Sequence, residues 1–349
     1  MHILKISMIA LVLMLLTLSL NTFWRKSPMN KTVKKGLLIY NQVDYEKNKW
    51  FAHELINKAA QFDLELSLVL RENLVLTIEN GSFLASAVLE PSLTMAAPSV
   101  AEPSLTADLS TLMEGEIAKS KVLSPLNVEF VINRTRDTII GVHFEKMGCR
   151  VFNTSEVTEI CNHKGKTHQL INSAGIPSVK TLLGNVHYFS PSMLSFAYPV
   201  ILKAVSGHGG SEIYKISNEA ELEAHLKSLR TEDFILQELC SNPGIDIRVF
   251  TLGTEILAAV KRQSTESFKS NYSLGGLAIA YTLTSEEESL VKRILSLLDF
   301  DLVGIDFILD QEGRFLFNEI EDVVGTRTLY LNYDLDVVSL YLNYIANAF

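Results

Sequence analysis

The chain has 349 residues, of which 47% are hydrophobic and 20% are charged, and its formal net charge is −9. These proportions are typical of a globular protein with enough chain for two or three structural units. The negative charge argues against nonspecific nucleic-acid binding, which requires a basic surface that displaces counterions. We therefore expect no nucleic-acid partner.

Residues 3–20 are almost all apolar, and Arg25 and Lys26 follow them. Such a stretch could tether the protein to a membrane, with the basic pair keeping the following domain in the cytoplasm. Alternatively, Met29 begins the protein, because the strand-like run after it resembles the start of an α/β domain. Residues 1–28 are therefore treated as a separate hydrophobic segment.

Three cysteines, Cys149, Cys161 and Cys240, lie far apart and have no spacing typical of metal ligands or of a disulfide framework. Buried thiols in a reducing compartment are the simplest interpretation, which favours a cytoplasmic globular part. The sequence is compatible with an oligomer.

The first elements in chain order predict a βαβ unit and hence an α/β class. A strand at 36–40 precedes an amphipathic helix at 48–62 and a second strand at 64–70. Residues from about 84 to 120 are rich in Ala, Ser, Pro and Thr, and Glu-Pro-Ser-Leu-Thr occurs twice within them. This composition predicts a low-complexity surface insertion.

The later elements are strands and hairpins that alternate with helices. We expect strands at 128–132, 149–152, 199–205 and 234–239, helices at 162–174, 218–229, 285–298 and after 334, and hairpins at 245–262 and 302–320.

A Gly-rich segment follows the strand that carries Lys203. Gly207, Gly209 and Gly210 would let backbone N–H groups approach phosphate oxygens. A plain hairpin turn explains the same glycines, since the segment matches neither a Walker A motif nor the dinucleotide fingerprint.

The hairpin at 302–320 carries three acids. A turn centred on Gln311 and Glu312 places Asp306 opposite Phe317, and strand alternation then puts Glu319 and Glu321 on the face of Phe317. Three converging carboxylates repel one another unless a cation lies among them, and an all-oxygen site favours Mg²⁺ or Mn²⁺. A solvated sheet end is the alternative, but Asp306 lies within an apolar run.

The order of these motifs resembles the ATP-grasp superfamily, and within it the RimK-like branch of glutamate ligases that modify ribosomal protein S6. The motifs are Asn162-His163-Lys164, the Tyr198–Lys203 strand with its Gly-rich loop, Phe234–Cys240, Asp246-Ile247-Arg248, Lys261-Arg262, Phe268–Asn271, Gly304-Ile305-Asp306 and Asn318–Glu321. The resemblance covers about two-thirds of the chain.

The resemblance implies an ATP-grasp fold with three parts. A pre-ATP-grasp βαβ domain would occupy residues 29–160, a small lid subdomain 161–232, and a C-terminal subdomain with a mixed or antiparallel sheet 233–349. The loop at 133–137 and the stretch at 327–330 would face the substrate.

The resemblance also implies roles for individual residues. Arg262 and Lys203 would be catalytic, offsetting charge on the transferred phosphoryl group, and Asp306, Glu319 and Glu321 would bind Mg²⁺ or Mn²⁺. ATP would be bound by Lys164, Lys203, Ser206, Gly207, His208, Gly209, Gly210, Gln237, Glu238, Leu239, Cys240, Asp246, Lys269, Ser270 and Asn271. Glu321 stands where the family usually has Asn, and no Pro-Gly turn follows it, which puts the substrate in doubt.

The expected function is that of an ATP-dependent carboxylate–amine ligase that works through an acyl phosphate. It would join glutamate or another amine to a peptide or a small acid. Two alternatives stay open at this point: an ATP-binding module without ligase activity, and an ATP-grasp phosphotransferase with a different acceptor.

Overall fold

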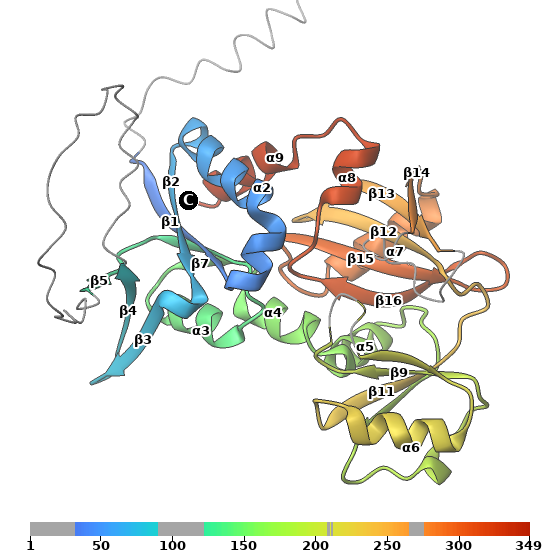
Figure 1. The fold of residues 1–349 in the computed structure, drawn as a ribbon. Coiled ribbons are helices and arrows are strands. Elements are labelled where there is room, and N and C mark those ends of the chain that lie inside the picture. The colour runs from blue at the N-terminus through green and yellow to red at the C-terminus, as the bar shows by residue number, and fades with distance from the viewer. Residues whose placement is uncertain (1–31, 90–121, 208–209, 211, 265–275) are drawn as a thin grey trace, which may run out of the picture.

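The computed structural model describes residues 32–89, 122–207, 210, 212–264 and 276–349. The chain forms an N-terminal α/β domain, a small sheet with one covering helix, and a larger C-terminal sheet (Figure 1). No helix within the described ranges has both the length and the apolar character needed to cross a bilayer. The apolar stretch at 3–20 lies outside those ranges.

The N-terminal domain is built on a four-stranded parallel sheet with the order β2-β1-β6-β7. Leu38 and Tyr40 of β1 face a core that includes helices α2 and α9, whereas Leu37 and Ile39 face the opposite core with α3. This alternation follows from the two-residue period of a strand, and it confirms the predicted βαβ start. The elements are β1 (Lys34–Tyr40), α2 (Gln42–Ala59), β2 (Leu64–Leu70), β6 (Phe130–Asn133), α3 (Thr138–Lys146), β7 (Arg150–Phe152) and α4 (Ser155–Cys161), with short 3₁₀ turns at Ala60–Phe62 and Arg71–Asn73.

A small antiparallel sheet flanks this domain, and part of it lies where the insertion was predicted. β3 (Leu74–Glu79) pairs with β4 (Ser82–Leu89), which pairs with β5 (Val122–Pro125). Starting the insertion at about residue 84 was therefore wrong. Ala85 and Ala87 are buried on one side of β4, so these small residues have the alternation of a strand despite their low-complexity appearance. Both copies of the repeat, at 90–94 and 102–106, lie outside the described residues.

The lid is a four-stranded antiparallel sheet with the order β10-β9-β11-β8. Leu222 of helix α6 packs on it in a core with Leu202, Phe234 and Leu236. Because β11 pairs with both β8 and β9, the lid sheet continues to residue 238, beyond the boundary predicted at 232. The elements are α5 (Lys164–Ser173), β8 (Thr181–Asn185), β9 (Val200–Ala204), β10 (Ile213–Ile216), α6 (Glu219–Ser228) and β11 (Asp233–Glu238), with a 3₁₀ turn at Pro191–Met193.

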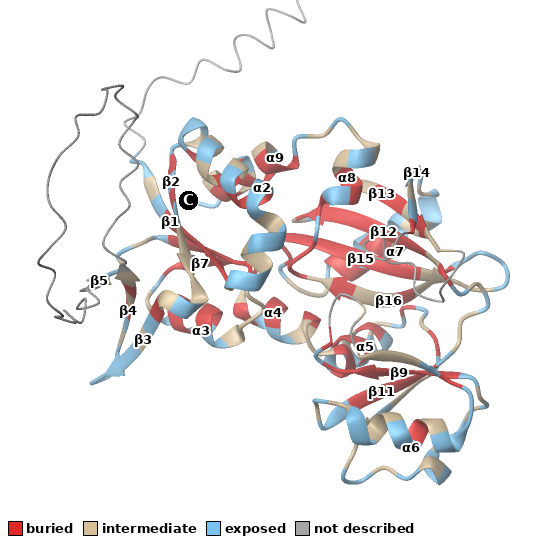
Figure 2. Cartoon of the chain, viewed as in Figure 1, coloured by how far each residue is buried: buried red, intermediate tan, exposed pale blue. Residues whose placement is uncertain are grey.

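The C-terminal subdomain is a five-stranded antiparallel sheet with the order β14-β13-β12-β15-β16. Figure 2 shows that its central strands are buried over most of their length. Helix α7 covers one face, and Thr284 and Glu287 form the capping box at its N-terminus. The elements are β12 (Ile245–Leu252), β13 (Glu255–Gln263), β14 (Leu277–Tyr281), α7 (Ser285–Leu295), β15 (Leu302–Leu309), β16 (Phe315–Glu321), α8 (Arg327–Asn332) and α9 (Val337–Ala346).

Candidate active site

The acidic hairpin has a different register from the predicted one. The N–H of Asp310 donates to the carbonyl of Arg314 at 3.0 Å, and Gly313 adopts a φ of +81°. The turn therefore contains three residues, which places Phe307 opposite Phe317. The predicted pairing of Asp306 with Phe317 was wrong, because a left-handed glycine adds one residue to the turn.

A second irregularity restores the predicted convergence of the acids. Between Asp306 and Phe307 the register shifts by one residue, so Asp306 pairs with Glu319 and Asn318 is left over as a bulge. The bulge lets Phe317 point into the core while Glu319 points to the opposite face. Strand alternation then places Glu321 on the same face as Glu319.

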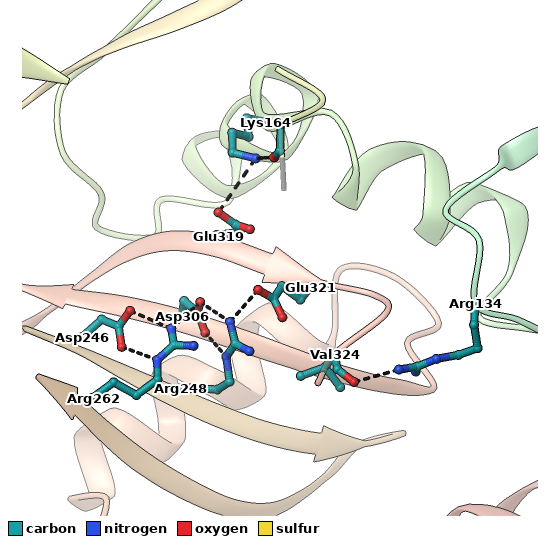
Figure 3. Close-up of polar contacts among 10 residues, drawn as sticks. Arg134, Lys164, Asp246, Arg248, Arg262, Asp306, Glu319, Glu321 and Val324 are labelled. Carbon is teal, nitrogen blue, oxygen red and sulfur yellow. Dashed lines mark hydrogen bonds and ion pairs between the residues drawn. The ribbon is translucent and has the colours of Figure 1, made fainter. Parts of the chain in front are cut away.

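Asp306 is buried and is held by two arginines (Figure 3). The Nε and Nη2 atoms of Arg248 donate to its two carboxylate oxygens at 2.7 Å each, and Arg262 Nη2 donates at 2.7 Å. Burial raises the pKa of Asp306, but the two arginine charges outweigh it and lower the pKa overall. Arg262 in turn donates two 2.6 Å hydrogen bonds to the carboxylate of Asp246. The predicted ATP contact Asp246 is thus a partner of the predicted catalytic Arg262.

The three acids differ in how well their surroundings suit a metal ion. An oxygen-only donor set is what Mg²⁺ prefers, but both oxygens of Asp306 already accept from arginine. Glu321 accepts from Arg248 at 2.6 Å, and Glu319 lies 3.9 Å from the Lys164 ammonium. Within the described part of the chain, no group of three or more His, Cys, Asp or Glu side chains is arranged to hold a metal. Glu319 and Glu321 therefore fit the ion better than Asp306.

A cavity of about 100 Å³ lies between the lid sheet and the C-terminal sheet. Its walls come from β9, β11, β12, β15 and β16. It brings together many predicted ATP contacts and all three acids, namely Lys203, Gly210, Gln237, Glu238, Leu239, Cys240, Asp246, Asp306, Glu319 and Glu321. Residues that are far apart in the sequence therefore line one concave site.

Lys203 is the buried cation of this cavity, with 7% of its surface exposed. Its Nζ donates to Oδ1 of Asn318, the bulged residue, at 2.8 Å. Burial lowers the pKa of Lys203 to about 8, although the nearby Glu319 carboxylate acts in the opposite direction. The ammonium is thus held next to the acidic hairpin.

His168 on α5 supports the cavity from behind and was not predicted. Its Nε2 lies 3.0 Å from the amide nitrogen of Gln237, which also donates to Thr181 at 2.9 Å. Burial, followed by the charge of Lys203, lowers the pKa of His168 to about 3. The ring is therefore neutral near pH 7, and the Gln237 side chain is committed to these internal contacts.

A second cavity of about 470 Å³ lies between the N-terminal domain and the C-terminal sheet. Seven of its lining side chains are basic and four are acidic. The basic ones are Lys47, Arg134, Arg136, Lys164, Arg248, Arg262 and Arg327, and the acidic ones are Asp44, Glu319, Glu321 and Asp322. Glu319 and Glu321 line both cavities, so the two spaces meet at these carboxylates.

The remaining predicted ATP contacts divide into two groups. Lys164, Ser206 and Gly207 line the second cavity, and the Lys164 ammonium donates to the carbonyl of Gly207. The positions of His208, Gly209, Lys269, Ser270 and Asn271 lie outside the described residues.

Several residues of the second cavity were not assigned a role from the sequence. Asp44 and Lys47 come from α2, which carried no motif. Arg248 was quoted in a motif but given no function. The loop at 133–137 was expected to face a substrate, and the structure places Arg134 and Arg136 of that loop in the cavity wall. Alternation within β12 could have revealed Arg248, because it shares a face with Asp246.

The sequence pattern of the RimK-like ATP-grasp domain matches residues 161–345, which is more than half of the chain. The chain belongs to the RimK-like ATP-grasp family. The fold and the ATP-dependent, carbon–nitrogen bond-forming ligase class expected from the sequence are thereby confirmed.

Two relatives and one solved structure illustrate the match. An uncharacterized MG011 homolog from Mycoplasma pneumoniae is 24% identical over 297 residues, covering 85% of this chain and 86% of that protein. Human N-acetylaspartylglutamate synthase A is 28% identical over 215 residues, covering 60% of this chain and 55% of the synthase. A RimK-domain ATP-grasp protein from Sphaerobacter thermophilus superposes with a TM-score of 0.59 at 15% identity, covering 90% and 98% of the two chains. The chain thus spans about half the length of the human synthase, while the structural match shows the shared fold.

Proposed function

We propose that this RimK-like ligase joins an acidic carboxylate substrate to an amine, with glutamate as one of the two substrates. The observation that carries the proposal is the meeting of the two cavities at Glu319 and Glu321. ATP in the smaller cavity would place its γ-phosphate at the entrance to the larger one. The basic lining of the larger cavity favours anionic substrates.

In the proposed reaction, a carboxylate oxygen of the substrate attacks the γ-phosphorus and ADP leaves. The amine then attacks the carbonyl carbon of the acyl phosphate, loses a proton, and phosphate leaves as the amide forms. Lys203 would bind the transferred phosphoryl group from the ATP side, and Arg262 would offset its charge from the substrate side. Mg²⁺, held by Glu319 and Glu321, would neutralise charge on the phosphates.

Two features support glutamate in particular. The first is the excess of basic over acidic side chains around the larger cavity. The second is the relative whose name describes synthesis of N-acetylaspartylglutamate, a product with several carboxylates. The proposed cytoplasmic location agrees with the three free cysteines, of which Cys149 and Cys161 are buried.

The test uses the full chain with ATP and Mg²⁺. ADP release is measured with L-glutamate and a panel of carboxylic acids and peptides, and hydroxylamine is added to trap an acyl phosphate as a hydroxamate. Substrate-dependent ADP release with hydroxamate formation is expected. ADP release without a trapped hydroxamate would favour a phosphotransferase, and ATP binding without turnover would favour a binding module.

A further inference from the structure

Arg134 is a buried arginine in the wall of the larger cavity. It directly follows β6 and is 4% exposed. Its Nη2 donates to the carbonyl of Val324 at 2.9 Å, as Figure 3 shows. The guanidinium carbon lies 5.4 Å from the ring centre of Phe51 and 6.0 Å from that of Tyr40. These contacts hold the side chain against the segment 322–324, which directly follows Glu321.

The charge of Arg134 has no carboxylate partner among the residues that the structure describes: no such ion pair occurs within 4.0 Å. Its Nε is buried and donates no hydrogen bond to any described group. The charge of Arg134 does act on the carboxylate of Asp322, in the same segment as Val324, and it opposes the burial that raises the pKa of Asp322. Asp322 makes no ion pair with Arg134 within 4.0 Å, and it accepts a hydrogen bond from Asn162 at 3.0 Å. Arg248 and Arg262, which line the same cavity, each donate two hydrogen bonds to one carboxylate.

A buried guanidinium that makes no ion pair is unfavourable, because a close partner of opposite sign is needed to offset the desolvation of an ion. Arg134 therefore has the surroundings of a group that is completed by an anionic ligand. Arg136 lies two residues further along the same loop with a φ of +63°. Its Nη1 is 2.8 Å from Asp44 Oδ2. The loop thus presents two cations at the carboxyl end of a parallel strand, the edge where α/β sheets bind ligands.

We propose that Arg134 binds a second carboxylate of the substrate, one that takes no part in the reaction, so that the enzyme selects a dicarboxylic substrate. This rests on the proposed ligase function, because the reacting carboxylate is the one beside Glu319 and Glu321. The guanidinium of Arg134 donates to the second carboxylate in a charge-assisted hydrogen bond. A carboxamide in its place cannot neutralise the guanidinium.

The test measures equilibrium binding to the full chain loaded with Mg²⁺ and a non-hydrolysable ATP analogue. Two pairs of probes differ by one carboxylate: L-glutamate against L-glutamine, and N-acetyl-L-aspartate against N-acetyl-L-asparagine. The wild-type protein is expected to bind the acid of at least one pair about tenfold or more tightly than the amide. Arg134→Met is expected to remove that preference while binding the ATP analogue normally.

Arg134→Lys and Arg293→Met are the comparison variants. Lysine keeps the charge but lacks the guanidinium geometry, so it is expected to retain part of the preference. Arg293 also donates to a backbone carbonyl, that of Ala174 at 2.9 Å, but it lies on α7 and lines neither of the two cavities. Arg293→Met is therefore expected to keep the full preference for the acid.

Thermal unfolding separates a binding role from a structural one. Because Arg134→Met removes a buried charge that makes no ion pair, the Tm of the variant without substrate is expected to stay the same or to rise. A preference for the acid that persists in Arg134→Met, or that is absent in the wild type, overturns the proposal whatever the Tm. If the preference depends on Arg134 but no ADP is released with any substrate, the ligase function fails and the carboxylate site stands. If monocarboxylates support turnover equally well in both proteins, the site fails and the ligase function stands.

Discussion

Arg248 donates two hydrogen bonds of 2.7 Å to the carboxylate of Asp306, so the acid that looks most like a metal ligand in the sequence is already paired. The same guanidinium lies 2.6 Å from Glu321. Arg248 therefore joins the centre of the C-terminal sheet to the acidic hairpin. This gives Asp306 a structural role in addition to any role at the metal.

Asp306→Asn is expected to lower the free energy of unfolding by about 3 kcal/mol or more, because it leaves two buried arginines with too little negative charge. Urea unfolding of the variant and the wild type measures the difference. Loss of ADP release without any loss of stability would contradict the structural role.

Glu319→Gln tests the metal site with less effect on stability than Asp306→Asn, because Glu319 is partly exposed and the Lys164 ammonium lies 3.9 Å away from it. The Mg²⁺ concentration for half-maximal ADP release is expected to rise by at least about tenfold, as loss of a ligand weakens the site. Little change in Tm is expected. Glu312→Gln, in the turn of the same hairpin, is the matched control. An unchanged Mg²⁺ requirement in Glu319→Gln would remove this residue from the metal site.

Lys203→Met is expected to reduce ADP release by roughly 10²–10³-fold, because a preorganised cation next to the transferred phosphoryl group is lost. Lys215→Met removes an exposed lysine from neighbouring strand β10 of the same lid sheet and controls for loss of charge. Steady-state ADP release at saturating ATP gives the comparison. Equal rates in the two variants would show that Lys203 does not act on the phosphates.

The buried His168 predicts a pH dependence of stability. Its pKa is about 3 in the folded chain, against an ordinary value of 6.5. The unfolded chain therefore binds more protons between these values, so stability is lost as the pH falls below about 6.5. One such group contributes a slope of up to about 1.4 kcal/mol per pH unit.

Urea unfolding between pH 4.5 and 7.5 measures this slope, and His168→Gln is expected to make it shallower. His187→Gln, on the surface of the lid, controls for removal of a histidine. A variant at His168 with the wild-type slope would show that another group causes the acid sensitivity.

Gly304→Ala tests the packing that holds Arg134 in place. A Cβ at position 304 would lie 2.6 Å from Cγ2 of Val324, whose carbonyl accepts from Arg134. Displacing Val324 is expected to cost about 1–3 kcal/mol of stability and to weaken binding of the acidic substrate. Gly325→Ala places its Cβ in open space and is the control for stability only, because Gly325 itself lines the larger cavity. Unfolding and substrate-binding measurements on both variants test whether displacement of Val324 lowers stability and weakens binding.

Local patterns in the sequence were sufficient for the elements that depend on neighbouring residues. The apolar run at 36–40 and the helical spacing of apolar residues at 48–62 predicted the βαβ start. The order of Lys164, Lys203 and the acidic hairpin predicted the family. The predicted start of the insertion and the predicted end of the lid were wrong, because pairing between distant strands decides both. β4 pairs with β5, which follows the low-complexity segment in the chain, and β11 joins the lid sheet through β8 and β9.

In the acidic hairpin, too, some features follow from the local sequence and others only from strand pairing. Residue types and two-residue alternation identified Asp306, Glu319 and Glu321 as a group, and that group does lie on one face. The predicted register was nevertheless wrong twice, once at the left-handed Gly313 and once at the Asn318 bulge. The two one-residue shifts add to two residues, which returns the acids to one face because strand side chains alternate with a period of two. Hydrogen bonding across the whole sheet sets such shifts, so a single strand does not reveal them.

The sequence by itself determined the family and the residue types that the family expects at the site: two lysines, a Gly-rich segment and three acids in the order of an ATP-grasp ligase. Only the tertiary structure decided which charges are paired. It paired Asp306 with Arg248 and Arg262, and it placed Arg134 in the wall of the larger cavity with no carboxylate within 4.0 Å among the described residues. The physical reason is that charge compensation depends on distances of a few ångströms between segments that are far apart in the chain.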